Sequence, residues 1–288
     1  MNQSNFGKKL TQSIQKTSPL VIGIDPDIAL FPISLKKQSL QETIFSFCKI
    51  VIDNIETKAN IIKFQSAYFE EQGVEGLIAL KKALKYAKEK KYITILDCKR
   101  GDIGSTAEAY ARSIFTPQKD FESDAMTVNP YLGPESLTPF IKLAHQNNKG
   151  IFILVKTSNP ESEMVQDQGN PSVSEKIAHW IQSKNPKNEY GAIGAVIGGT
   201  IENTTKYRKI MPSTHFLMPG MGPQGGKIEN ISKCFDKKGN GVLIPVSRGI
   251  TKPTNIEISQ SQYSKEIKTN INHYYSLIKQ TINQPTKQ

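Results

Sequence analysis

Two aspartates and a lysine have a spacing suited to proton transfer. Asp97 and Lys99 are two residues apart at the end of an apolar segment, and Asp102 follows three residues later. Side chains alternate along a strand, so Asp97 and Lys99 would point to the same side while Cys98 packs outward. The turn at Gly101 would return Asp102 to that side. Two neighbouring carboxylates keep an ammonium group protonated, which suits a proton donor.

A second lysine would extend this group. Lys63 ends the preceding apolar segment, so on a neighbouring strand it would form an alternating row with Asp97, Lys99 and Asp102. A purely structural ion-pair network is the alternative. Burying four charges costs free energy, and perturbed charged groups collect at functional sites, so the row favours a catalytic role.

Glycines and an arginine in the last third of the chain form a candidate phosphate site. Residues 219–226 read Pro-Gly-Met-Gly-Pro-Gln-Gly-Gly, and Arg248 follows the next apolar segment. Backbone N–H groups in such loops bind phosphate oxygens, and an arginine can hold a phosphate through two hydrogen bonds. Gln224 could close over the phosphate if this loop is a lid. A plain glycine-rich turn is the alternative.

The elements that must position these groups are short and apolar. Eight segments rich in Ile and Val, mostly without alternation, are typical of strands buried on both faces. They are residues 20–24, 61–64, 92–97, 125–128, 151–155, 192–197, 215–218 and 242–246. Each gap between them can hold a helix, and helical periodicity is clearest at residues 40–55, 74–91 and 260–282.

Eight strands that alternate with helices predict an α/β fold, a (β/α)₈ TIM barrel. A doubly wound open sheet is the alternative, but its G-x-G-x-x-G signature does not follow the first strand. We expect residues 1–288 to form a single domain, with a polar segment at 1–18 and a C-terminal helix and tail at 251–288. In a barrel the strand ends meet at one face, so the polar groups described above would share one site.

The composition limits the classes of protein. The chain has 288 residues, of which 37% are hydrophobic and 22% charged, so it can bury a real core. It contains no apolar run of bilayer length and no apolar leader, and its three cysteines are isolated in sequence. These features predict a cytoplasmic protein with no membrane segment, no disulfide framework and no metal site.

The net charge of +11 is carried mostly by lysine. Only four of the 37 basic residues are arginines, and the lysines are dispersed apart from a group at residues 81–91. Proteins that read nucleic acids rely on arginine and on interleaved aromatic residues. The sequence therefore favours solvated helix faces, and we expect no nucleic-acid partner.

In this order along the chain, the motifs resemble the orotidine 5′-phosphate decarboxylase family. The resemblance rests on Asp-x-Lys-x-x-Asp at residues 97–102, continuing to Thr106, and on three further segments. These are Asn-Pro-Tyr-Leu-Gly at 129–133, Lys-Thr-Ser-Asn-Pro at 156–160, and the glycine-rich segment at 219–226. They are most similar to the type 2 subfamily, and the resemblance covers about residues 20–250.

The resemblance implies a reaction and roles for the charged row. The reaction is decarboxylation of orotidine 5′-phosphate to UMP and CO₂, the last step of de novo UMP biosynthesis, without metal or cofactor. Lys99 would donate the proton to C6 of the pyrimidine, and Asp97 would lie beside the departing carboxylate. Asp102 would complete the row, and Asp102 and Thr106 would reach across the interface of a homodimer into the partner's site.

The resemblance also implies the binding residues. Asp25 and Lys63 would bind the ribose hydroxyls, and Ser158 would hydrogen-bond the base. The phosphate would be held by the end of the glycine-rich loop and by a cation, namely Gln224, Gly225, Gly226 and Arg248. The resemblance also raises a further partner, orotate phosphoribosyltransferase, which precedes the decarboxylase in UMP synthesis and with which the protein would associate.

Three competing functions remain open. The first is that of the Mg²⁺-dependent sugar-phosphate decarboxylases and aldolases, which share the Asp-x-Lys-x-x-Asp signature. In those enzymes a glutamate is expected at the end of strand two. Lys63 stands there in this chain and would repel Mg²⁺. The second competing function is a basic nucleic-acid-binding module, and the third is a barrel that binds a nucleotide without turning it over. The complete charged row favours the decarboxylase.

Overall fold

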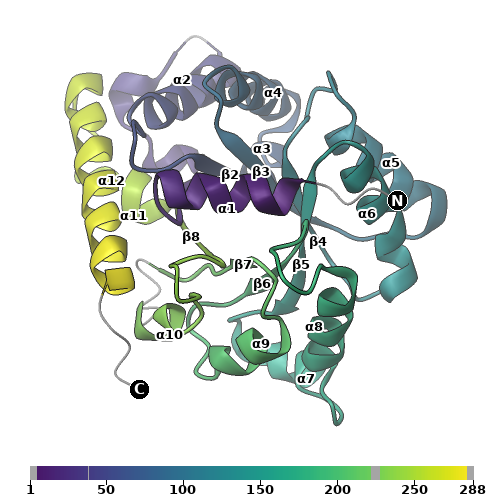
Figure 1. The fold of residues 1–288 in the computed structure, drawn as a ribbon. Helices are drawn as coiled ribbons and strands as arrows, with labels where there is room; N and C mark the ends of the chain where they lie inside the picture. Colours follow the sequence, from purple (N-terminus) through teal and green to yellow (C-terminus); the bar gives the residue numbers. More distant parts are fainter. Residues whose placement is uncertain (1–4, 38, 222–227, 284–288) are drawn as a thin grey trace.

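Eight parallel strands close into a barrel (Figure 1). The computed structural model describes residues 5–37, 39–221 and 228–283. The strands follow one another in chain order, and β1 pairs with β8 to close the barrel. They are β1 Leu20–Ile24, β2 Ile61–Gln65, β3 Ile93–Arg100, β4 Ala125–Val128, β5 Gly150–Lys156, β6 Ile193–Ile197, β7 Phe216–Leu217 and β8 Val242–Val246. The predicted TIM barrel is therefore confirmed, and the open sheet is not the fold.

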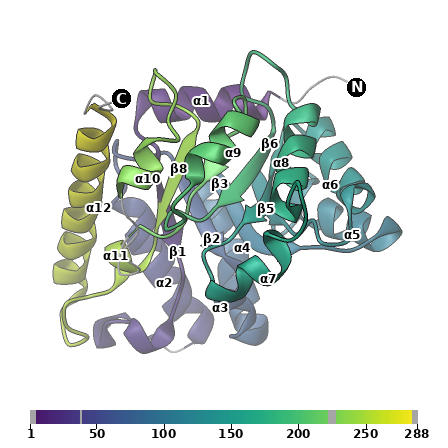
Figure 2. The same ribbon diagram turned by 90° about the horizontal axis from the view of Figure 1, so that it is seen from below.

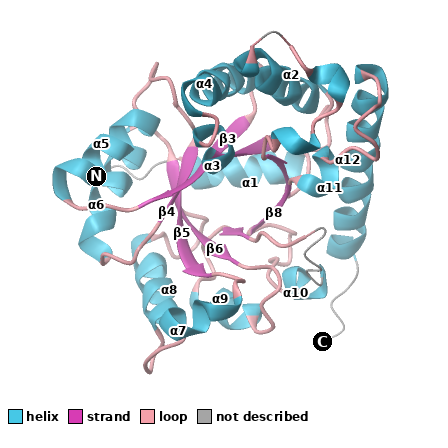
Figure 3. Ribbon diagram, turned by 180° about the vertical axis from the view of Figure 1, so that it is seen from behind, coloured by secondary structure: helices cyan, strands magenta, loops and turns pink. Residues whose placement is uncertain are grey.

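Helices surround the strands on the outside of the barrel (Figure 3). The longer ones are α2 Leu40–Asp53, α4 Gly73–Glu89, α5 Gly104–Phe115, α6 Pro134–Gln146, α8 Val173–Lys184 and α12 Gln260–Asn283, and the seven-residue α9 Thr204–Ile210 lies between β6 and β7. Short helices follow several strands: α3 Ser66–Glu70, α7 Glu163–Gln166, α10 Ile228–Ser232 and α11 Arg248–Thr251. The main core lies between the strands and this ring. None of the helices in the described part of the chain is long and apolar enough to cross a membrane.

The polar N-terminal segment forms a helix, α1 Phe6–Lys16, which the sequence pattern did not predict. Phe6, Leu10 and Ile14 lie on one face and pack with the side chains that fill the barrel interior, such as Ile95 of β3. Figure 2 shows α1 across one end of the barrel, with α3, α7 and α11 at the other end. Because α1 closes the end at which the strands begin, the opposite end is left for a site.

Strand boundaries differ from the predicted ones mainly at β3 and β7. β3 continues past Asp97 to Arg100, which pairs with Val128 of β4. β7 has only two residues, one fewer at each end than predicted, although Met218 N still donates to the Leu243 carbonyl of β8 at 2.9 Å. The extension of β3 lies at the carboxyl end of the strand, where Asp97 and Lys99 stand.

Candidate active site

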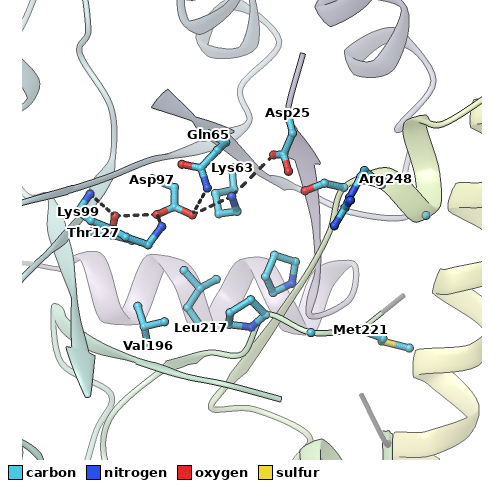
Figure 4. A pocket seen from close by; sticks show the side chains of 15 residues that line it. Asp25, Lys63, Gln65, Asp97, Lys99, Thr127, Val196, Leu217, Met221 and Arg248 are labelled. Atoms are coloured by element: carbon cyan, nitrogen blue, oxygen red, sulfur yellow. Dashed lines mark hydrogen bonds and ion pairs between the residues drawn. The ribbon is translucent and has the colours of Figure 1, made fainter. Parts of the chain in front are cut away.

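A pocket of about 230 Å³ opens at the carboxyl ends of the strands (Figure 4). One half of its lining is charged and polar and comes from β1–β4: Asp25, Lys63, Gln65, Asp97, Lys99 and Thr127. The other half comes from β6–β8 and is mostly apolar, including Val196, Leu217, Met221 and Pro245, with the polar Ser247 and Arg248 just after β8. Such a pocket can hold a flat, polar ring against the apolar wall and present charges to its edge.

Four charged side chains form a row along one wall of the pocket. Lys63 Nζ lies 2.9 Å from Asp97 Oδ2 and 4.0 Å from Asp25 Oδ1. Lys99 Nζ lies 2.7 Å from Asp97 Oδ1. The row therefore runs Asp25–Lys63–Asp97–Lys99, and Asp97 is its centre.

Asp97 and Lys63 are both buried, and each keeps the other charged. Burial alone would raise the pKa of Asp97, but the ammonium groups of Lys63 and Lys99 hold that pKa far below its usual range. Burial alone would lower the pKa of Lys63, but the charges of Asp97 and Asp25 raise it above its ordinary value. Both groups are therefore ionised at neutral pH.

Strand alternation correctly predicts that Asp97 and Lys99 share the pocket while Cys98 packs against the outer core. The backbone at this point is nevertheless irregular. The register between β3 and β4 shifts between Leu96 and Arg100, and Lys99 has a left-handed φ of 44°. Non-glycine residues seldom adopt this conformation, and they do so mainly where the surrounding structure imposes it, as at active sites.

One carboxylate oxygen of Asp25 lacks a hydrogen-bond donor in the described part of the chain. Its Oδ1 is buried and has no hydrogen-bond partner among the described residues. A buried carboxylate oxygen without a donor costs free energy unless a bound molecule satisfies it. Asp25 therefore fits a role as acceptor for a hydroxyl group of a ligand in this pocket.

Asp102 and Thr106 lie outside the pocket. The expectation that the turn returns Asp102 to Lys99 within one chain is not met, since no ion pair joins Asp102 to any lysine in the described ranges. The chain stays paired with β4 as far as Arg100, and Asn129 N donates to the Arg100 carbonyl at 2.8 Å. It then leads outward to α5, where Asp102 Oδ1 accepts a 2.8 Å hydrogen bond from Ile103 N.

Ser158 follows β5 in an exposed loop and is not among the residues that line the pocket. Gln166 holds this loop, because its side chain accepts from Thr157 N at 2.9 Å and donates to Thr157 Oγ1 at 2.8 Å. At the end of β6, Gly198 lets the loop approach, since a Cβ there would lie 2.9 Å from Ser158 Cβ. These contacts hold the loop beside the strand ends in a conformation in which Ser158 does not reach the pocket.

The predicted phosphate residues are only partly described. Gln224, Gly225 and Gly226 lie outside the described residues. Arg248 begins α11 directly after β8 and lines the pocket with an exposed side chain. Figure 4 places Arg248 beyond Asp25, on the opposite side of the pocket from Lys99. A ligand whose anionic end is bound by Arg248 would therefore extend along the charged row toward Lys99.

Comparison with known proteins agrees with this geometry. The sequence model of the family described as Orotidine 5′-phosphate decarboxylase / HUMPS family matches residues 18–258. The chain belongs to this family. The match begins just before β1 and ends after α11, so it contains the whole barrel.

Relatives from this family match most of the chain. A protein of Caldicellulosiruptor bescii named orotidine 5′-phosphate decarboxylase is 36% identical, with 93% of this chain and 98% of the relative covered. One of the same name from Petrotoga mobilis is 38% identical, with 84% and 86% covered. The solved structure of Leishmania donovani OMP decarboxylase has a TM-score of 0.72 at 30% identity, with 93% of this chain and 98% of that chain covered.

Two pocket residues of this orotidine 5′-phosphate decarboxylase family member were not predicted from the sequence. Gln65 Nε2 donates to Asp97 Oδ2 at 3.2 Å, and Thr127 Oγ1 donates to Asp97 Oδ1 at 2.9 Å. Gln65 could have been found, because it lies two residues after Lys63 on the same strand. Thr127 could have been found as the one polar residue of β4, Ala-Met-Thr-Val.

Proposed function

We propose that the protein decarboxylates orotidine 5′-phosphate to UMP and CO₂, the last step of de novo UMP biosynthesis. The observation that carries the proposal is the buried row Asp25–Lys63–Asp97–Lys99 in the pocket at the carboxyl end of the barrel. The names of relatives at 36% and 38% identity support the same reaction. No metal or cofactor takes part in the proposed step.

In the proposed reaction the bond between C6 and the carboxylate breaks, and its electron pair stays on C6. Lys99 provides a fixed positive charge beside that carbon and then transfers a proton to it, while CO₂ leaves. Lys99 regains its proton from solvent. Asp97 lies beside the departing carboxylate and holds the Lys99 ammonium group at 2.7 Å.

The rest of the substrate is bound away from the reacting carbon. Asp25 and Lys63 bind the ribose hydroxyls, and Asp25 Oδ1, which among the described residues has only the Lys63 ammonium group at 4.0 Å, gains a hydrogen-bond donor. Gln224, Gly225, Gly226 and Arg248 bind the phosphate, and Ser158 bonds the base when the loop after β5 moves toward it. Binding energy from the phosphate can then be used to assemble the site.

The proposed assembly is a homodimer of the type 2 subfamily, in which each chain forms one barrel domain. Asp102 lies just before α5 and Thr106 in its first turn, on the outside of the barrel, and both would complete the partner's site. Large apolar side chains are exposed around them: Ile103 by 56%, Leu132 by 48% and Tyr131 by 78%. A second copy that covers this face would bury these side chains, which is the usual reason for such a patch.

Replacing Tyr131 by Glu tests the dimer, because a charge in place of the most exposed of these apolar side chains opposes its burial. We expect the mass in solution, measured by light scattering, to halve. We expect kcat/KM to fall about 100-fold, because Asp102 no longer reaches Lys99 of the partner. Gln15→Glu, on the exposed face of α1, is the control and should change neither. A Tyr131→Glu protein that stays dimeric, or a wild-type monomer with full activity, contradicts the proposed assembly.

Two further proposals follow from the place of this reaction in UMP synthesis. The enzyme works in the cytoplasm, and it associates with orotate phosphoribosyltransferase, which makes its substrate. The solved structure named Leishmania donovani UMP synthase supports the second proposal. It matches this chain with a TM-score of 0.74 over only 57% of its own length, so that protein carries a further part beside its barrel.

The test of the proposed reaction mixes the purified protein with orotidine 5′-phosphate in EDTA. Loss of the orotate absorbance is followed together with CO₂ release. Turnover in EDTA supports the proposal. A folded protein without turnover overturns it, and a second assay with Mg²⁺ and a keto-sugar phosphate then examines the sugar-phosphate decarboxylase alternative.

A further inference from the structure

The hydroxyl of Thr127 lies between the two residues at the reacting end of the row. Thr127 is 1% exposed and stands on β4, next to β3. Its Oγ1 donates to Asp97 Oδ1 at 2.9 Å and accepts from the backbone N–H of Lys99 at 2.9 Å. One hydroxyl group therefore contacts both the carboxylate and the main chain of the proposed proton donor.

The hydrogen bond from Lys99 N to Thr127 Oγ1 stands where the ladder between β3 and β4 is interrupted. The ladder between β3 and β4 pairs Leu96 with Met126 and resumes only at Arg100 and Val128. Lys99 lies in this gap with its left-handed φ of 44°. A backbone N–H that is partly removed from water needs a partner, and Thr127 Oγ1 supplies it at the point where the β4 backbone does not.

The backbone conformation determines where the Lys99 ammonium group lies. Asp97 and Lys99 share one face of β3, and the left-handed backbone at Lys99 sets the direction from which Nζ comes within 2.7 Å of Asp97 Oδ1. The same Oδ1 atom accepts the Thr127 hydroxyl. Thr127 thus fixes both ends of the Lys99–Asp97 contact at once.

We propose that Thr127 is a positioning residue for the proposed decarboxylation, which holds the Lys99 backbone in its left-handed conformation and orients Asp97 so that the ammonium group is aimed at the reacting carbon. The inference rests on the proposed function. The other carboxylate oxygen of Asp97 is held separately, by Lys63 at 2.9 Å and Gln65 at 3.2 Å. Loss of the Thr127 hydroxyl should therefore disturb Lys99 more than Asp97.

The chain offers a matched control at the other end of the barrel. Thr94 on β3 is 3% exposed and also bonds a carboxylate and a backbone N–H. Its Oγ1 donates to Asp124 Oδ2 at 3.3 Å and accepts from Asp124 N at 3.2 Å. Thr94→Val therefore removes the same pair of bonds as Thr127→Val, but far from the pocket.

The experiment compares Thr127→Val, Thr127→Ser and Thr94→Val in steady-state turnover of orotidine 5′-phosphate. We expect Thr127→Val to lower kcat about 100-fold, because misplacing a reacting group by about 1 Å costs that much. We expect KM to change less than about threefold, because the ribose and phosphate contacts remain. Thr127→Ser keeps the hydroxyl and should retain at least a tenth of kcat, and Thr94→Val should retain all of it.

Three results would overturn the proposal: full kcat in Thr127→Val, a Thr127→Ser variant as impaired as Thr127→Val, or an equal loss in Thr94→Val. Thr127→Ala carries the same expectation if the valine variant does not fold. Crystal structures of these variants give a measure that does not depend on turnover. Without the hydroxyl, the distance from Lys99 Nζ to Asp97 Oδ1 should exceed 4 Å, and an unchanged contact would contradict the role even if the wild type proved to act on another substrate.

Discussion

Replacing Lys99 by Ala should abolish measurable turnover of orotidine 5′-phosphate while the barrel stays folded. Lys99 is the only proposed proton donor, and its ammonium group also stabilises the charge that develops on C6. General acid catalysis contributes roughly 10²- to 10⁴-fold and a fixed electrostatic partner roughly 10²- to 10³-fold, so we expect kcat/KM to fall by at least about 10⁴-fold. The measurement is CO₂ release under single-turnover conditions, with circular dichroism to verify the fold.

Lys9→Ala is the matched control for this variant. Lys9 pairs with Asp124 at 2.8 Å and its side chain is 52% exposed, whereas Lys99 pairs with Asp97 at 2.7 Å and is 45% exposed. Both substitutions remove a half-exposed lysine from an aspartate, but Lys9 lies on α1 at the closed end of the barrel. Full activity in Lys9→Ala and none in Lys99→Ala would assign the loss to the site. Retained activity in Lys99→Ala would exclude Lys99 as the donor.

The barrel could be predicted from the sequence because both faces of each strand are buried. Runs of Ile and Val reveal such strands directly, and the bounds predicted for β1, β4 and β8 coincide with those of the structure. The charged residues that follow these runs must then meet at one end. The approximate position of Asp25, Lys63, Asp97, Lys99 and Arg248 around one pocket follows from that topology alone.

The remaining features depend on contacts that sequence periodicity does not contain. The place of Asp102 depends on the path of the chain after the irregular pairing of β3 with β4, which strand alternation cannot describe. Thr127 acts through one hydroxyl that is shared between two neighbours, and threonine is otherwise an ordinary strand residue. The helix α1 was concealed because only Phe6, Leu10 and Ile14 are large apolar residues in a polar segment.

Replacing Asp97 by Asn should lower both turnover and stability, because Asp97 is the centre of the row. Asn keeps the shape but removes the charge that faces Lys63 and Lys99. Lys63 is 5% exposed, and its other carboxylate, Asp25, lies 4.0 Å away. Leaving a buried charge without its partner costs about 3 kcal/mol of the free energy of unfolding. We also expect kcat to fall roughly 10³-fold, since Lys99 loses the group that orients it.

The pH dependence of stability separates this charge effect from a change in packing. The folded pKa of Asp97 lies below its ordinary value of about 4, so its ionised form contributes stability that is fully present above that pH. The contribution is lost as the pH falls toward the folded pKa. In urea denaturation the gap between wild type and Asp97→Asn should therefore be largest at neutral pH and should narrow below about pH 4. Asp120→Asn removes an exposed carboxylate that lies 2.8 Å from Lys81, and it should cost at most about 1 kcal/mol. A gap that stays constant with pH would show that packing at position 97, and not its charge, stabilises the barrel.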